Sequence, residues 1–554
     1  MRCGIRCAAV VAGAVALVGC AATPRHDEAA LAAIAQGALE AHVRFLASDA
    51  LEGRMTGTRG YATAAEYVAS QFRLIGLEPA GTEGFFQPVP YAAAQIDAER
   101  SRVRLHRDGR SRTLVWKKDW IAGADVLREH VQARAPAVFV GYGVQAPELG
   151  HDDYAGLDVR GKLVVFLLGA PKGFAANPRA HYSSTVAKEA VAAAHGAIGT
   201  VVLRDAHSAQ KYRWEHIANN AGRVASMKWV AADGKAADYL PELRASIVLS
   251  EDAAAKLFEG APRSHADILA ANRAGEPVPT FALRGEIEVD RRGTVSRQAS
   301  PNVLAVLRGS DPALAAEHVV YSAHLDHLGV GAAVNGDTIY NGAFDNAMGV
   351  AMMLETARAF AAMNPRPRRS ILFAAVGGEE RFLLGSDYFV HYPTVPVRQL
   401  VANINLDNPL VLFPMAEVVA FGAEHSTLGA AVDAAARAEG LRQAPDPMPD
   451  EVVFIRSDQY SFVRQGVPSV FLRPGFASAD PAIDGGQRIE EYQRTHYHQP
   501  SDDASQPVHW ESAVRFTRVN VRAGRIVADA ELPPRWHAGN FFGELFGKDR
   551  AAPP

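Results

Sequence analysis

The chain has 554 residues, of which 48% are hydrophobic and 21% are charged. Because domains usually contain about 100–200 residues, this length predicts two or three domains, and the ordinary composition excludes a disordered, collagen-like or fibrous protein. The formal net charge of -4 comes from 57 basic and 61 acidic residues without a long basic run, which argues against nucleic acid as a partner.

The first twenty residues have the pattern of an export signal. Arg2 and Arg6 precede an apolar stretch from residue 8 to residue 18, and a small-residue exit follows. This order of charged, apolar and small residues predicts a secretory signal peptide. The apolar stretch is shorter than the about 20 residues with which a helix crosses a membrane, so a permanent membrane span is not expected.

The exit sequence Leu-Val-Gly-Cys ends at Cys20 and resembles a bacterial lipobox. The resemblance implies that Cys20 is acylated and anchors the exported chain to the cell envelope. Ala21 favours the outer membrane, facing the periplasm or the exterior. The three cysteines of the chain all lie in this region, at Cys3, Cys7 and Cys20, so none remains for a disulfide after cleavage. The alternative is an ordinary signal peptide in which Cys20 has no role.

The next segments alternate between helical and β-rich patterns. We expect a tether over residues 20–40 that is mobile around residues 21–28. A helix follows, whose apolar residues recur on one face from residue 62 to residue 75 and which ends at Gly76. Short strands at 138–140, 163–168 and 200–203, with a small-residue helix at 185–195, predict a compact β-rich unit. Pro277 and Pro279 mark its exit.

Long apolar strands return after this unit. They are predicted at 302–306, 319–323, 371–376, 400–406 and 467–472, and amphipathic helices at 347–360, 426–438 and 460–464 alternate with them. This alternation predicts an α/β fold, a mainly parallel mixed sheet flanked by helices, with the β-rich unit inserted into it. The expected division is a signal peptide at 1–19, a tether at 20–40, the first part of the main domain at 41–130, the insert at 131–285, the second part of the main domain at 286–535 and a C-terminal tail at 536–554.

Five metal-ligand-type residues lie where these strands give way to loops or helices: His324, Asp345, Glu380, Asp407 and His498. Two histidines and three carboxylates can hold a pair of zinc ions, and strand ends are where an α/β sheet places its chemistry. Taken singly, most of them have an ordinary interpretation as a polar turn, a helix cap or a surface residue. Asp407 is harder to explain without a cation because it ends a buried strand.

Two further carboxylates lie beside these residues. Asp326 is close enough in sequence to accept the imidazole N–H of His324 and to fix its tautomer. Glu379 directly precedes Glu380, and adjacent carboxylates point in different directions, so one can bind metal while the other handles protons. We expect His327 to be a loop residue or a supporting neighbour.

At this point the sequence resembles the M28 family of zinc peptidases. The segments SAHLDHLG, GAFDNAMG, GGEE, INLDN and YHQPSDD each match a motif of that family, and VFVGYGVQAPELGHDDYAGLDVRGKLVVFLLG resembles a protease-associated (PA) domain. The resemblance covers residues from about 40 to 530. It implies the zinc exopeptidase fold with an inserted PA domain.

The resemblance also implies a role for each residue. Four residues are implied as terminal ligands of two zinc ions and one as the bridge between them: His324, Glu380, Asp407 and His498, with Asp345 shared. Glu379 is implied as the general base for a hydroxide that the two ions share, and Tyr497 as a partner of the oxyanion. Phe344 and Met348 depart from the polar or small residues of many relatives, so we expect them to shape the floor of the substrate pocket.

These features favour a dizinc aminopeptidase that hydrolyses N-terminal residues from peptides. One alternative is a carboxypeptidase of the same family, which needs an arginine fork, from Arg456 or Arg473, for a terminal carboxylate. The complete ligand set with Glu379 argues against the single-zinc glutaminyl cyclases. An alternative from another class is a non-catalytic lipoprotein that binds ligands through its PA and peptidase-like domains. The insert either covers one side of the cleft or stabilises the fold, and the sequence does not predict the oligomeric state.

Overall fold

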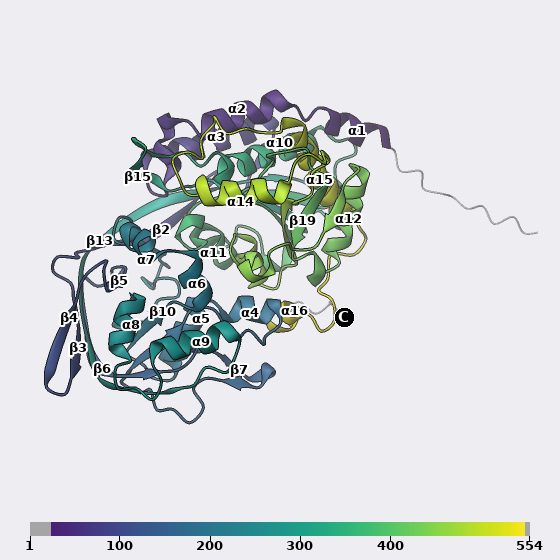
Figure 1. Cartoon of the computed structure of the whole chain (residues 1–554). Helices are drawn as coiled ribbons and strands as arrows, with labels where there is room; N and C mark the ends of the chain where they lie inside the picture. Colours follow the sequence, from purple (N-terminus) through teal and green to yellow (C-terminus); the bar gives the residue numbers. More distant parts are fainter. Residues whose placement is uncertain (1–23, 549–554) are drawn as a thin grey trace, which may run out of the picture.

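The computed structural model describes residues 24–548, and Figure 1 shows its two parts, a sheet covered by helices and a β-rich unit below it. The signal peptide and Cys20 that the sequence predicts lie outside the described residues. Within residues 24–548, no helix combines the length and the apolar character that crossing a membrane requires.

The main sheet is built on parallel strands that are almost entirely buried. β14 pairs in parallel with β17 and β18, and β18 pairs in parallel with β21. Antiparallel strands flank this group, β13 beside β17 and β19 beside β21. The strands are β2 Phe86–Ile96, β13 Phe281–Leu307, β14 His318–His324, β17 Ser370–Val376, β18 Leu400–Leu406, β19 Glu417–Phe421, β20 Arg442–Ala444 and β21 Ser469–Pro474. The predicted mainly parallel mixed sheet is therefore confirmed.

Helices cover both faces of this sheet. Along β14, Val319 and Tyr321 pack into the larger core, whereas Val320 packs into a separate core on the opposite face. Side chains of a strand alternate between faces, so a strand covered on both faces is apolar throughout. The helices on the larger core are α2 Gln36–Leu46, α3 Arg59–Ile75, α10 Met348–Ala362, α12 Leu428–Ala438 and α15 Trp510–Asp529, and those on the other are α11 Leu384–His391 and α13 Gln459–Val463.

The helix predicted before Gly76 is α3, and its ends show why it forms there. The side chain of Thr58 accepts a hydrogen bond from the amide of Tyr61 at the first turn. Gly76 closes the last turn with a φ of 87°, a left-handed conformation that glycine adopts without strain. Between these caps Val68 and Phe72 are fully buried, so the amphipathic pattern seals one side of the sheet.

The two ends of the described chain differ from the expected tether and tail. Helix α1 Pro24–Ala32, the short link after it and helix α2 bury Leu31, Ile34 and Leu39 in the larger core, so the described part of the expected tether consists of two helices and a short link that contact this core. At the other end, helix α16 Phe541–Phe546 inserts Phe542 fully into a cluster with Phe454. The expected tether and the expected tail were wrong. A few apolar side chains that are widely spaced in sequence pack against a surface that forms only in the folded protein.

The β-rich unit has its own sheet and its own cores. β9, β10 and β12 are parallel, β6 joins β9, and the β3–β4 hairpin pairs with the first half of β13. The strands are β3 Arg102–Arg107, β4 Arg110–Leu114, β5 Trp120–Ile121, β6 His130–Phe139, β9 Leu163–Leu167, β10 Gly199–Leu203 and β12 Ala245–Leu249. The predicted helix at 185–195 is α5 Thr185–Ala194.

The borders of this unit differ from the expected 131 and 285. The β3–β4 hairpin precedes residue 131 and already belongs to the second sheet. β13 runs without interruption through residue 285 and takes part in both sheets. The strand β11 Ser226–Trp229 pairs with β2, and the Trp229 indole N–H donates to the buried carboxylate of Asp387 at 2.7 Å. The unit is therefore tied to the main sheet by backbone pairing as well as by side chains.

Short elements complete the chain. They are β1 Glu78–Pro79, β7 Gln145–Ala146, β8 His151–Asp152, β15 Gly329–Val334, β16 Asp337–Tyr340, α4 Ala176–Tyr182, α6 Ala206–Lys211, α7 Trp214–Asn220, α8 Glu251–Leu257, α9 His265–Ala274 and α14 Gly485–Thr495.

Candidate metal centre and active site

Three of the five metal-ligand-type residues come from neighbouring parallel strands. His324 is the last residue of β14, Glu380 follows β17 through a glycine turn, and Asp407 directly follows β18. The register aligns His324 with Val376 of β17, so these strand ends meet at one edge of the sheet. Gly378 has a φ of 75°, and this left-handed turn brings the chain back toward that edge.

The structure brings all five residues into one cluster with Asp345 at its centre. His324 Nε2 lies 3.1 Å from Asp345 Oδ1 and 3.1 Å from Asp407 Oδ1. His498 Nε2 lies 3.2 Å from Asp345 Oδ2 and 3.3 Å from Glu380 Oε2. Each oxygen of Asp345 thus faces a different histidine, and each histidine faces one further carboxylate. His498 keeps 35% of its side chain exposed, so the cluster opens to solvent on that side.

A buried carboxylate that the sequence reasoning missed holds the central segment. Asp502 accepts hydrogen bonds from the amides of Phe344 at 3.0 Å and of Asp345 at 3.1 Å. Its own carbonyl accepts from the amide of Ala343 at 3.0 Å. Asp502 is fully buried. The signal was present, because Asp502 lies in the YHQPSDD segment only four residues after His498.

The expected role of Asp326 needs correction. The carboxylate of Asp326 lies 3.9 Å from His324 Nδ1, whereas the carbonyl oxygen of Asp326 lies at 3.1 Å. The main-chain carbonyl therefore takes the Nδ1–H and leaves Nε2 to face the carboxylates. The Asp326 carboxylate instead accepts the amide N–H of Glu379 at 3.2 Å. The main-chain carbonyl of Asp326 is thus closer to the His324 ring than the carboxylate of the same residue.

His327, expected to be a loop or supporting residue, belongs to the cluster. Its ring is fully buried, and Nδ1 lies 2.8 Å from Glu380 Oε1. Two groups of ligand atoms meet closely enough to hold a metal ion, His324 with Asp345 and Asp407, and His327 with Asp345 and Glu380. The sequence could have suggested His327, since it follows the same strand as His324 by three residues.

The donors of the cluster fit a pair of cations. His327 Nδ1 and Glu380 Oε1 lie 2.8 Å apart as an ion pair, and among residues 24–548 these two buried atoms and His327 Nε2 have no hydrogen-bond partner of good geometry. Buried polar atoms need a partner, and atoms aimed at a common point can share a metal ion. Imidazole and carboxylate together are the ligands that zinc accepts.

Electrostatics indicate the same need for positive charge. Burial opposes protonation of His324, but the carboxylates of Asp407 and Glu379 outweigh it and raise its pKa well above the ordinary value. Burial likewise opposes ionisation of Asp345, but hydrogen bonds from His324 and His498 lower its pKa well below the ordinary value. In the bare chain the imidazoles supply the positive charge that the carboxylates require.

Part of the chain is similar to a known peptidase family. Residues 302–523 match the sequence model of Peptidase family M28, and this segment contains all five ligand-type residues and Glu379. Over this segment the chain is similar to that family of peptidases.

Individual relatives of the M28 segment add detail. The chain is 31% identical over 138 residues to "Aminopeptidase NAALADL1" of Mus musculus, a stretch that covers 24% of this chain and 17% of that protein. The rat protein of the same name is 30% identical over 138 residues, with the same shares. The match thus spans less than a fifth of these curated relatives. In fold, the chain is similar to an aminopeptidase from Aneurinibacillus sp. strain AM-1, with a TM-score of 0.51 at 18% identity over 91% of this chain and 96% of that one.

Glu379 and Tyr497 lie at the cluster of ligand-type residues, and within the described residues they take no part in its ion pairs. Within the described residues, the Glu379 carboxylate forms no ion pair, and burial together with the nearby Asp407 and Glu380 raises its pKa well above the ordinary value. The Tyr497 ring stacks on His498 with 3.8 Å between ring centres. Burial, with Asp345 and Glu380 nearby, raises its pKa well above the ordinary value, so the phenol keeps its proton.

A second buried acid in the M28 segment escaped the sequence reasoning. Asp458 is fully buried, and burial raises the pKa of its carboxyl group to about 7, although the nearby His324 and the Ser386 hydroxyl act in the opposite direction. It adds negative charge near Glu379. No local pattern marks it, because an Asp before a helix is an ordinary cap.

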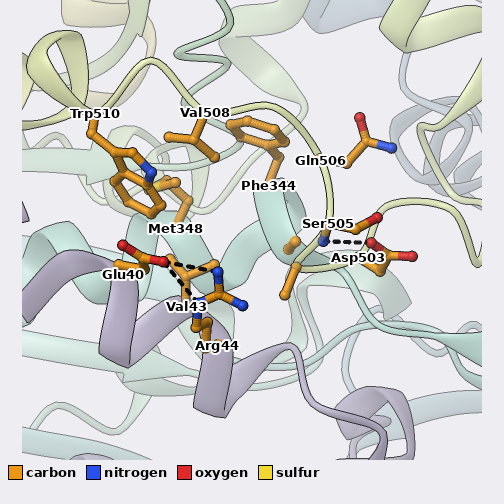
Figure 2. A pocket seen from close by; sticks show the side chains of 12 residues that line it. Glu40, Val43, Arg44, Phe344, Met348, Asp503, Ser505, Gln506, Val508 and Trp510 are labelled. Atoms are coloured by element: carbon orange, nitrogen blue, oxygen red, sulfur yellow. Dashed lines mark hydrogen bonds and ion pairs between the residues drawn. The ribbon is translucent and has the colours of Figure 1, made fainter. Parts of the chain in front are cut away.

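Phe344 and Met348 do not form the floor of the metal cluster, in contrast to the expectation. They line a cavity of about 340 Å³ together with Val43 and Trp510, and none of the five ligand-type residues lines it. Figure 2 shows their side chains beside this cavity, with an Arg44–Glu40 ion pair at its edge. The difference from many relatives at these two positions therefore bears on packing around this cavity.

Proposed function

We propose that the chain is a dizinc aminopeptidase that releases N-terminal residues from peptides. The observation that carries this proposal is the shared carboxylate, since the two oxygens of Asp345 face His324 and His498 separately at 3.1 and 3.2 Å. A carboxylate presented in this way suits two neighbouring metal ions. The family match and the printed names of the relatives support a peptidase acting at free N-termini.

Each zinc ion would have its own pair of ligands in addition to the shared one. His324 and Asp407 would hold one ion, and His498 and Glu380 the other, with Asp345 common to both. His327 lies close enough to Glu380 to orient it or to enter the second site. A zinc pair, when bound, supplies an acidified water and a Lewis acid for the scissile carbonyl.

The chain's own residues would then handle protons and orientation. Glu379 would accept the proton of the attacking water and deliver it to the departing amine, which requires a carboxylate beside the metal site that is not itself engaged. The Asp326 carboxylate fixes the amide of Glu379 and so the direction of its side chain. The Tyr497 hydroxyl, kept protonated by burial, would donate to the oxyanion.

We further propose that the chain is exported and lipid-anchored at Cys20 in the bacterial envelope, and that the β-rich unit is a PA domain. The pattern of residues 2–20 supports the first, and the sequence motif supports the second. Labelling with a fatty-acid probe tests the anchor. A Cys20→Ser variant should lose the label, and a labelled variant would contradict the assignment.

The experiment that tests the proposed function compares wild-type protein with Glu379→Gln. The wild type, expressed from residue 21, should bind near two zinc ions per chain and cleave free-N-terminus aminoacyl reporters but not N-blocked peptides with a free C-terminus. Glu379→Gln should keep its zinc and lose turnover by about 100-fold or more. Cleavage confined to the blocked peptides would favour a carboxypeptidase, and a zinc-loaded wild type inactive on both sets would overturn the proposal in favour of a binding protein.

A further inference from the structure

We propose that Phe382 contacts an apolar side chain of the substrate at the open side of the metal centre, so that the enzyme prefers peptides with an aromatic or large aliphatic residue directly after the scissile bond. This inference rests on the proposed function and assigns a specificity-determining residue to it. The residue after the scissile bond is the first residue of the departing peptide.

Phe382 lies in the chain directly beside the metal cluster. It follows Glu379 by three residues and Glu380 by two, in the loop that leaves β17. Because successive Cα atoms are about 3.8 Å apart, the Cα atoms of Phe382 and Glu380 are within about 8 Å of each other. Glu380 lies 3.3 Å from His498, whose side chain is 35% exposed. Phe382 therefore follows the ligand-type residue that faces the open side of the cluster.

The side chain of Phe382 points to solvent although its neighbours are packed. Phe382 is 86% exposed, the largest value among the exposed large hydrophobic residues within 24–548. Leu383 packs against the core cluster around Phe454, and Leu384 is buried. A single exposed apolar residue on a surface is ordinary, but a loop beside a catalytic centre is where residues contact ligands.

The backbone holds Phe382 in this position at a conformational cost. The φ angle is 70° at Phe382 and 63° at Leu383, in the left-handed region that bulky residues rarely adopt. The amide of Leu383 donates to the carbonyl of Glu379 at 3.0 Å, and that of Leu384 donates to the carbonyl of Gly378 at 2.8 Å, so the loop is closed by its own main chain. Strained residues of this kind cluster at functional sites. Since the ring gains no burial in return for the strain, contact with a ligand explains its position.

Two further apolar side chains border the same loop. Met55 lies beside it, because the Met55 sulfur is 3.5 Å from Nη2 of Arg381. On its other side Met55 packs directly against Gly329, where a Cβ atom would lie 2.7 Å from the Cβ atom of Met55. The next residue, Val330 in β15, is 59% exposed. The segments that follow β14 and β17 thus both present exposed apolar side chains next to Met55, and Phe382 is the larger of them.

The exposure of Phe382 indicates which part of a peptide meets it. Sites that select a small group surround it with walls, and a ring that is 86% exposed offers a face without walls. The departing peptide leaves through the open side of the cluster, so its first side chain can lie flat on such a face. Aromatic rings form contacts of this kind with other rings and with aliphatic groups.

The test compares two substrate pairs on zinc-loaded protein. In Ala-Phe-amide and Ala-Ala-amide only the residue after the scissile bond differs, whereas phenylalanyl and alanyl reporter amides differ only in the N-terminal residue. The wild type should favour Ala-Phe-amide by about 3–10-fold in kcat/KM, measured as released alanine, which is the effect of one aromatic contact. Phe382→Ala should bring this ratio to within about twofold of one and leave the ratio of the reporter pair as in the wild type. Phe382→Tyr, which keeps the ring, should keep the preference.

Phe382→Gly separates contact with the substrate from support of the fold. Glycine adopts a φ of 70° without strain, so this variant should melt at the same or a higher temperature than the wild type while it loses the preference. A lower melting temperature together with loss of zinc would make Phe382 a support of the loop and would overturn the inference.

The matched control is Leu74→Ala, which shortens a side chain that is 80% exposed near the end of α3. Leu74 lies away from the cluster, because the chain after α3 pairs with β13 beside the start of β17, whereas the cluster lies at the end of β17. The ratios of both pairs in this variant should equal those of the wild type.

Three kinetic outcomes would overturn the inference while leaving the proposed function intact. The first is a wild type that cleaves Ala-Phe-amide and Ala-Ala-amide with equal kcat/KM, and the second is a Phe382→Ala variant with the wild-type ratio. The third is a change in the reporter pair instead, which would place Phe382 at the N-terminal residue.

If neither pair is cleaved, the proposed function fails, and the uncleaved dipeptide amides then test Phe382 by the shift in melting temperature that each produces. A larger shift with Ala-Phe-amide that disappears in Phe382→Ala would support the contact, and equal shifts would refute it.

Discussion

Removal of the Asp502 carboxylate should loosen the centre of the proposed metal site without touching a ligand. In Asp502→Ala, the amides of Phe344 and Asp345 lose acceptors at 3.0 and 3.1 Å in a fully buried place. A hydrogen bond to a charged group contributes about 1.5–3 kcal/mol, so the loss of two sums to roughly 3–6 kcal/mol. Because burial raises the pKa of Asp502, part of this is offset by removal of a costly buried charge. A net loss of about 2–4 kcal/mol remains.

The loss should appear in two separate measurements. Unfolding by urea should show the lower stability. The zinc affinity, measured by competition with a chromogenic chelator, should fall by about 10–100-fold, which is the usual effect of removing a residue that supports a metal ligand. The matched control is Asp503→Ala at the next residue, whose carboxylate accepts only the amide of Ser505 at 2.7 Å in its own loop. That variant should bind zinc like the wild type. Wild-type zinc affinity in Asp502→Ala would refute the reasoning that Asp502 positions Asp345.

Three further expectations concern other parts of the molecule. Burial lowers the pKa of Lys188 to about 7 from 10.5. Between these two pH values, Lys188 carries a proton in the unfolded chain but not in the folded one. The free energy of unfolding should therefore rise with pH from 7 upward, by up to about 1.4 kcal/mol per pH unit from this side chain. Urea unfolding at pH 7, 8 and 9 should therefore show a shallower rise in Lys188→Met, and an identical rise would contradict the assignment. Phe542→Ala should destabilise the protein by about 3–5 kcal/mol because the ring is fully buried, a result measurable by calorimetry, whereas a free tail would give almost no change. Trp229→Phe removes the indole N–H that donates to the Asp387 carboxylate at 2.7 Å, and it should lower the free energy of unfolding by about 1–3 kcal/mol. Proteolysis of the β-rich unit should become faster. Unchanged proteolysis would argue that this contact does not hold the unit in place.

The sheet could be predicted because its strands are uninterrupted apolar runs. β14, β17 and β18 are buried at every position, and each was predicted within about one residue of its bounds, since a strand covered on both faces carries its signal in its own residues. Three of the ligand-type residues stand out in the sequence for a related reason, because His324, Glu380 and Asp407 lie at or just after such apolar strands.

What could not be predicted depends on contacts between distant segments. Helix α16 and Phe542 gave no pattern of their own, and the ring is buried because Phe454 and His425 lie nearby in the fold. The positions of Asp502 and His327, close in sequence to His498 and His324, made them candidates, but the contacts that they make depend on which strand ends they meet in the fold. The choice between the carboxylate and the carbonyl of Asp326 as the partner of His324 was set by a local backbone turn that residue type does not specify.

The most direct test of the central claim is a crystal structure of the zinc-loaded protein with anomalous scattering measured at the zinc absorption edge. We expect two anomalous peaks, each about 2.0–2.2 Å from a different oxygen of Asp345, one with His324 and Asp407 and the other with His498 and Glu380, and neither with Glu379 as a ligand. A single peak, or two peaks that do not share Asp345, would contradict the account of the site.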